Sequence, residues 1–151
     1  MNTGQEISDE VGDIDEALEN FWRRAVFRAK LNHLPSYFGP TPLEVVRPPA
    51  WAFGTTPEEA DGFLRDLLSG RTTAIAGSLR DYRADDGVVP ETGELGIVVD
   101  GHGTPAALVV VTEALTVPYA EVDSPTTVVE GAGFAPDTAM VVQRLRVLYS
   151  T

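Results

Sequence analysis

The chain has 151 residues and no cysteine, and its 23 acidic residues outnumber its 11 basic ones, which gives a formal net charge of −12. A chain of this length forms one domain with its own core, and the lack of cysteine excludes disulfides, zinc–thiolate sites and a cysteine nucleophile. The acidic balance argues against broad, sequence-independent nucleic-acid binding, which depends on neutralising phosphates.

The first twelve residues are acidic and polar, unlike a secretory signal, and the longest apolar run, 106–111, is too short to cross a membrane. We therefore expect a cytoplasmic protein whose residues 1–12 form a disordered tail. Asp13 and Glu16 then form a pair typical of a capping box, and a helix is predicted over about 14–32. Its core-facing residues recur at helical spacing: Ile14, Leu18, Phe21, Trp22, Ala25 and Ala29. Because acids fill its first turns, this face is expected to pack on the core rather than on anionic lipid.

Five prolines between His33 and Ala50 exclude a regular helix or a central strand there. This segment is expected to be an extended connector that ends at two buried anchors, Trp51 and Phe53.

A second helix is predicted over residues 57–69 by the clearest local signal in the chain. Thr56 and Glu59 form a T-x-x-E capping box around Pro57, and Gly70 supplies a left-handed stop.

Strands dominate the rest of the chain. The hydrophobic pattern predicts strands over 72–79, 94–100, 106–117 and 140–149, a polar loop over 80–92, a hairpin turn over 100–103 and a short helical or irregular crossing over 119–130. The last strand is expected to pair with the hairpin. Helices first and strands after favour an α+β fold.

Several short motifs follow one another in a recognisable order: Trp51 to Gly54, Asp81-Tyr82, Gly93-Glu94, Asp100 to Pro105, Glu130-Gly131 and Val141 to Tyr149. Together they resemble the ASCH-domain family of the PUA-like superfamily over about residues 51–149. The resemblance implies a small β-barrel with flanking helices and a cleft beside the turn from helix to strand. With the segments predicted above, the chain divides into three parts, namely the tail at 1–12, an N-terminal helix and proline-rich connector at 13–50 packed on the barrel, and the domain itself at 51–151.

Some members of that family are ribonucleases or amidohydrolases acting on an acetylated cytidine, and this chemistry rests on a G-x-K-x-x-T motif and a glutamate. The matching stretch here runs from Gly70 to Ile75, with Thr72 at the lysine position and Ile75 at the threonine position, and Glu113 matches the glutamate. An isoleucine can neither attack nor donate a hydrogen bond, and a threonine cannot replace a cation. The resemblance therefore implies a degenerate catalytic motif, with Thr72, Thr73 and Glu113 as the remaining catalytic candidates.

Ligand-binding candidates surround the same turn. They are Gly70, Arg71, Thr73, Arg80, Tyr82 and Arg83. Tyr82 is suited to stack on a base while the arginines hold phosphate, although the same loop also suits a simple cover for one end of the barrel.

We therefore predict a module that binds RNA or a nucleobase-like small ligand, without a cofactor, a metal, DNA or a membrane. One alternative is an RNA- or nucleoside-directed hydrolase with altered catalytic residues, which requires Glu113 to face the cleft within hydrogen-bonding reach of Thr72 or Thr73. The other alternative is an acidic protein-interaction module.

Overall fold

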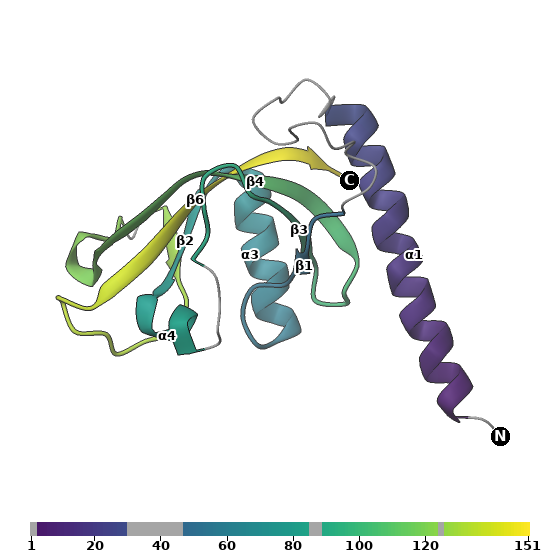
Figure 1. Cartoon of the computed structure of the whole chain (residues 1–151), viewed down its shortest axis with the longest axis horizontal. Helices are drawn as coiled ribbons and strands as arrows, with labels where there is room; N and C mark the ends of the chain where they lie inside the picture. Colours follow the sequence, from purple (N-terminus) through teal and green to yellow (C-terminus); the bar gives the residue numbers. More distant parts are fainter. Residues whose placement is uncertain (1–2, 30–46, 85–88, 124–125) are drawn as a thin grey trace.

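A computed structural model describes residues 3–29, 47–84, 89–123 and 126–151. Its centre is a six-stranded mixed sheet in the order β1-β3-β4-β6-β2-β5 (Figure 1). The strands are β1 Ala50–Trp51, β2 Ala74–Ser78, β3 Leu95–Val99, β4 Pro105–Pro118, β5 Thr127–Val129 and β6 Ala139–Ser150. The helices are α1 Thr3–Ala29, α3 Pro57–Ser69, α4 Leu79–Ala84 and the 3₁₀ helix η3 Tyr119–Glu121. This mixture of helices with one sheet is the α+β fold that the sequence predicts.

The longest strands, β4 and β6, pair antiparallel over nearly their whole lengths, as the sequence predicts for the last strand and the hairpin. Residues 107–111 of β4 are all buried, because both faces of the strand are covered. The pairing contains two register shifts, one between Leu108 and Val109 and one between Val111 and Glu113. Such bulges bend a strand, and Figure 1 shows β4 and β6 curving over α3.

Helix α3 fills the inner face of this curved sheet and has the bounds predicted from its capping signals. The Thr56 hydroxyl accepts a hydrogen bond from the Glu59 amide at 3.2 Å, and Gly70 ends the helix in the left-handed conformation at φ 82°. Three of its buried side chains, Phe63, Leu64 and Leu67, pack against inner-face residues of β2, β3, β4 and β6.

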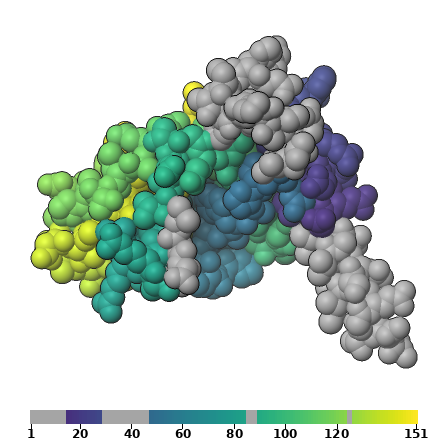
Figure 2. Space-filling model, viewed as in Figure 1, coloured from purple at the N-terminus to yellow at the C-terminus, as the bar shows by residue number. Residues whose placement is uncertain are grey.

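Helix α1 packs on the outer face of the sheet, at the right of Figures 1 and 2. Leu18, Phe21, Trp22 and Ala25 are buried there against β3, β4 and β6, which confirms the predicted packing of this face on the core. The helix begins at Thr3, so it includes residues 3–12, for which the sequence predicts a disordered tail. Acidic residues complement the positive end of a helix, which favours this extension.

Several predicted features fall outside the described residues. They are the side chains of Ile14 and Ala29, the predicted helix end at 30–32, residues 33–46 of the connector and residues 85–88 of the predicted loop. Within the described part, no helix is both long and apolar enough to cross a bilayer.

Two segments contain an element that the sequence does not predict, a helix in the polar loop and a strand in the short helical or irregular crossing. The predicted loop over 80–92 begins with α4, because the Ser78 hydroxyl caps the helix by accepting a hydrogen bond from the Asp81 amide at 3.1 Å. The predicted crossing over 119–130 contains η3 and then β5, which pairs in parallel with β2. The prediction missed β5 because a three-residue strand is too short to show a hydrophobic period.

Replacing Thr56 with alanine should lower the free energy of unfolding by about 1 kcal/mol, because the Glu59 amide loses the side chain that caps it. Urea denaturation measures this difference. The matched control is Thr55→Ala, since that threonine contributes only its backbone amide to the turn. Equal losses in the two variants would show that the hydroxyl of Thr56 is not the stabilising group.

Candidate functional site

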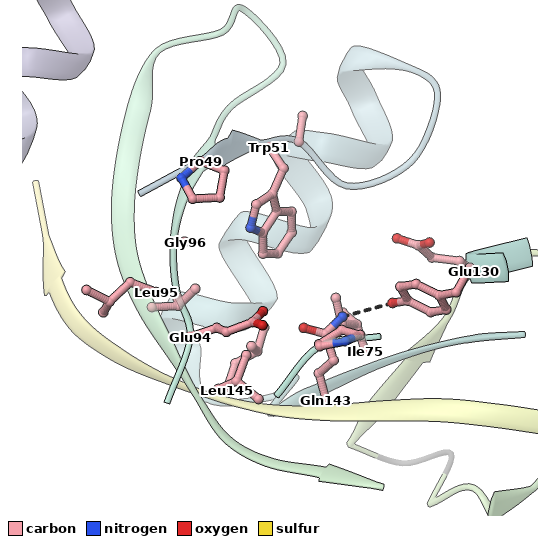
Figure 3. Close-up of a pocket in the computed structure, with 14 residues that line it drawn as sticks. Pro49, Trp51, Ile75, Glu94, Leu95, Gly96, Glu130, Gln143 and Leu145 are labelled. Atoms are coloured by element: carbon pink, nitrogen blue, oxygen red, sulfur yellow. Dashed lines mark hydrogen bonds between the residues drawn. The ribbon is translucent and has the colours of Figure 1, made fainter. Parts of the chain in front are cut away.

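A cleft of about 300 Å³ opens on the inner face of the curved sheet (Figure 3). Strands β1, β2, β3, β4 and β6 all contribute lining residues, and Glu130, which directly follows β5, contributes another. Because residues at both ends of the strand order reach the same space, the sheet must curl around it. The volume is at the lower end of the range for small-molecule pockets, so the cleft suits a small ligand.

The floor of the cleft is apolar and its walls carry the polar groups. Ile75, Val109, Val111 and Leu145 contribute apolar surface. The polar lining residues are Tyr82, Glu94, Glu130 and Gln143. As drawn in Figure 3, Trp51 projects into the cleft from above, Glu130 lies at the right, and Gln143 and Leu145 lie below.

Trp51 forms one aromatic wall. The short strand β1 holds it beside β3, where Trp51 pairs with Val98. Its indole lies directly on the backbone of Gly96, because a Cβ atom at that position would be 2.6 Å from the indole nitrogen. Its other neighbour is Phe63 of α3, with ring centroids 5.8 Å apart. The glycine in β3 therefore gives the indole its place in the cleft.

Tyr82 forms a second aromatic wall. Helix α4 carries it back over β2, where a Cβ atom on Gly77 would lie 3.2 Å from the ring. The side-chain amide of Gln143 donates a hydrogen bond to the Tyr82 hydroxyl at 2.9 Å, shown as the dashed line in Figure 3. This bond fixes both the phenol and the amide, so the oxygen of the Gln143 amide remains available as an acceptor.

The charged side chains among the described residues that line the cleft are the carboxylates of Glu94 and Glu130. Partial loss of solvent, together with the neighbouring Asp81 carboxylate, raises the pKa of Glu130 above its usual value. Burial also raises the pKa of Tyr82, an effect that the Gln143 hydrogen bond opposes and the charge of Glu130 reinforces. Tyr82 is thus a neutral phenol at physiological pH. No lysine, arginine or histidine is among the described lining residues.

In the parts of the chain that the structure describes, no three histidine, aspartate or glutamate side chains come together in a way that could hold a metal ion.

The predicted ligand-binding residues divide into one that lines the cleft and five that do not. Tyr82 is in the wall. Arg80 and Arg83 lie on the exposed side of α4, while Gly70 and Arg71 are exposed at the end of α3. Thr73 lines a separate hollow of about 90 Å³ next to Arg144.

The catalytic candidates are also separated from the cleft. Gln143 and Leu145 line it, so the alternation of a strand directs Arg144, which lies between them, to the opposite face. Glu113 pairs with Arg144, at 3.3 Å between the carboxylate and the guanidinium. Thr72 is buried, and its amide donates to the Asp66 carbonyl at 3.1 Å. The structure thus places Glu113 on the outer face of the sheet. Among the described residues, no hydrogen bond joins Glu113 to Thr72 or Thr73.

Ile75, which the resemblance places at the threonine position of the G-x-K-x-x-T motif, does line the cleft. The motif therefore faces the cleft through this one apolar side chain.

Among the polar and aromatic lining residues, four were not identified as site residues from the sequence: Trp51, Glu94, Glu130 and Gln143. For Gln143 a signal exists, because it is the one polar residue on the predicted inward face of the last strand. Trp51 was identified only as a core anchor. Glu94 and Glu130 were noted only as parts of the family resemblance.

A family model described as the ASCH domain matches residues 49–147. The chain belongs to the ASCH-domain family. This confirms the family and the fold that the motifs over 51–149 indicate.

Two solved structures are similar to this ASCH-domain chain. Protein EF3133 from Enterococcus faecalis V583, of the family described as DUF984, has a TM-score of 0.68 and 22% identity over 87% of this chain and 88% of its own. An ASCH domain from Lactobacillus crispatus JV V101 has a TM-score of 0.59 and 19% identity over 81% of this chain and 94% of its own. At these identities the similarity concerns the fold. No curated protein matches the chain.

Replacing Glu130 with glutamine should make the protein more stable at neutral pH. A raised pKa means that the folded state binds more protons than the unfolded state between the usual pKa near 4.5 and the raised value, so the stability of the wild type falls as the pH rises through this window. Glutamine does not ionise, so the E130Q variant does not lose stability in this pH window. Thermal unfolding at pH 7 and pH 3.5 should show a stabilisation of E130Q at pH 7 that disappears at pH 3.5.

The matched control is Glu91→Gln, an exposed glutamate outside the cleft. A gain in E130Q that is equal at the two pH values would contradict the assigned cause.

Proposed function

We propose that this ASCH domain binds a nucleobase-like small ligand in the cleft between Trp51 and Tyr82 and does not hydrolyse it. The observation that carries the proposal is the hydrogen bond from the Gln143 amide to the Tyr82 hydroxyl at 2.9 Å. Since the amide nitrogen is engaged, the wall presents an acceptor, the Gln143 carbonyl oxygen, beside a donor, the Tyr82 O–H. A nucleobase has the complementary feature, a flat ring edge on which a donor and an acceptor are neighbours.

The shape of the cleft supports a flat aromatic ligand. Two aromatic side chains and an apolar floor bound a small volume, and aromatic rings bind the faces of bases at about 1 to 3 kcal/mol per base. The Glu130 carboxylate adds a further acceptor at the side of the cleft. An exocyclic amine on the ring, as in cytosine, is the group that this carboxylate favours.

The charges favour a single base over an RNA strand. Glu94 and Glu130 line the cleft, and Asp81 lies close enough to Glu130 to raise its pKa. Phosphates would be repelled by these carboxylates, and no described lining residue carries a positive charge to hold them. A neutral nucleoside is therefore a better ligand than its 5′-phosphate.

The lysine and threonine of the G-x-K-x-x-T motif are both missing from the described lining of the cleft, which supports binding without hydrolysis. Ile75 occupies the threonine position, and Thr72, at the lysine position, is outside the cleft. The Tyr82 phenol is held neutral by its raised pKa and is a poor nucleophile in that form.

Isothermal titration calorimetry with cytidine, uridine and cytidine 5′-phosphate tests the proposal. We expect cytidine to bind about tenfold more tightly than uridine, since a hydrogen bond to a charged group contributes about 1.5 to 3 kcal/mol, and more tightly than its phosphate. Tyr82→Phe should weaken cytidine binding about fivefold through loss of the hydroxyl, and Tyr82→Ala should weaken it further through loss of the ring.

Tyr119 supplies the matched control, because it packs on Phe134 outside the cleft. Tyr119→Phe and Tyr119→Ala should bind cytidine like the wild type. Tight binding of single-stranded RNA that depends on Arg80 and not on Tyr82 would contradict the proposal. Release of acetate from an acetylated cytidine would contradict the claim that the ligand is not hydrolysed.

A further inference from the structure

A second hollow, of about 520 Å³, adjoins the cleft. Its walls are two short segments, 52–55 after β1 and 129–131 at the end of β5, together with Glu59 of α3. Ala52 and Glu130 line both the cleft and this hollow. The two spaces therefore adjoin each other at these two residues.

The folded framework holds the walls of the second hollow in place. The Glu130 amide donates to the carbonyl of Ala76 in β2 at 2.8 Å, which ties the segment 129–131 to the sheet. The Glu59 carboxylate accepts a hydrogen bond from the Thr55 amide at 3.3 Å, which closes the turn after β1. Gly54 lies against Glu59 so closely that any side chain there would collide with the carboxylate.

Apolar surface runs through the hollow beside its charges. Phe53 stacks on Phe63 of α3, with ring centroids 4.7 Å apart, and presents an aromatic surface next to Val129. The charged groups among the described lining residues are the carboxylates of Glu59 and Glu130. A methylene chain that ends in a cation matches this combination, because its stem packs on apolar side chains while its charged end reaches a carboxylate.

We propose that the natural ligand extends past Glu130 into this second hollow with an arm that carries a protonated amine. The inference rests on the proposed function, since it assumes that the ring occupies the cleft. It makes Glu59 a specificity-determining residue for the arm and leaves Trp51 and Tyr82 to bind the ring.

Three probes separate the ring from the arm. They are 1-methylcytosine, its derivative with a short aminoalkyl chain on the exocyclic N4 amine, and the hydroxyalkyl counterpart of equal length. Calorimetry with the full chain at low salt should show the aminoalkyl probe binding about tenfold more tightly than the hydroxyalkyl probe. The difference should shrink as salt is added, because the charged groups are partly exposed to solvent.

Glu59→Gln tests the role of the carboxylate, since glutamine keeps an oxygen for the Thr55 amide and removes the charge. This variant should lose most of the tenfold preference and bind 1-methylcytosine like the wild type. Glu58→Gln is the matched control, because Glu58 neighbours Glu59 but does not line the hollow, and it should keep the preference. Thermal unfolding of both variants reports any loss of folding.

Each outcome bears on a different claim. Equal binding of the amino and hydroxy probes, or a preference that survives in Glu59→Gln, would overturn the second site and leave the ring site intact. If 1-methylcytosine and both longer probes all fail to bind the folded wild type, the proposed function itself is overturned, and the second site with it.

Discussion

The antiparallel pairing of β4 with β6 is the constraint on which the rest of the structure depends. These strands are the only pair that runs the length of the described sheet, and their two register shifts set its curvature. The inner side of the curve holds α3 and the cleft, and the outer side holds α1. The pairing of β4 with β6 determines which side chains face the inner side of the sheet and which face the outer side. The position of each site residue on these strands therefore depends on where the two bulges occur.

The fold could be predicted in outline because its signals are local. Thr56 and Gly70 define the bounds of α3, and Asp100 defines the hairpin turn by accepting hydrogen bonds from the amides of His102 and Thr104. Family motifs spread over residues 51–149 then supplied the architecture. A long apolar run predicted the double-sided burial of β4.

The site could be predicted only in part, because two bulges invert the simple alternation of side chains. Val111 faces inward, so regular alternation would direct Glu113 inward as well, opposite Gln143. The shift after Val111 instead pairs Glu113 with Arg144 on the outer face. The second shift turns Tyr149 outward in the same way, where its ring packs 5.4 Å from that of Phe21. The position of a β-bulge cannot be predicted from the hydrophobic pattern of a single sequence.

The sequence predicts that Tyr82 stacks on a base, but it indicates Trp51 only as a core anchor and does not predict that the two rings line one cleft. Trp51 and Tyr82 are distant in sequence, and each rests on a glycine in a neighbouring strand, Gly96 and Gly77. In the sequence those glycines resemble ordinary small strand residues. Their function emerges only when the curved sheet brings the strands together, since a side chain at either position would push the ring from its place.

Charge connects the composition of the whole protein to the cleft. The net charge of −12 already weighed against phosphate recognition, and the cleft repeats this sign locally with Glu94 and Glu130. The arginines that the sequence offered as phosphate contacts, Arg71, Arg80 and Arg83, lie outside the cleft. The proposed ligand would therefore be bound by stacking and hydrogen bonds, which favour a neutral or cationic ring.

The most direct test of this account uses the two tryptophans of the chain. Labelling tryptophan with ¹⁵N gives one indole N–H signal from Trp51 in the cleft and one from Trp22 in the buried core under α1. During a titration with cytidine, we expect the Trp51 signal to move saturably while the Trp22 signal stays in place. A Trp51 signal that does not move at cytidine concentrations in the millimolar range would contradict the claim that the cleft binds a nucleobase-like ring.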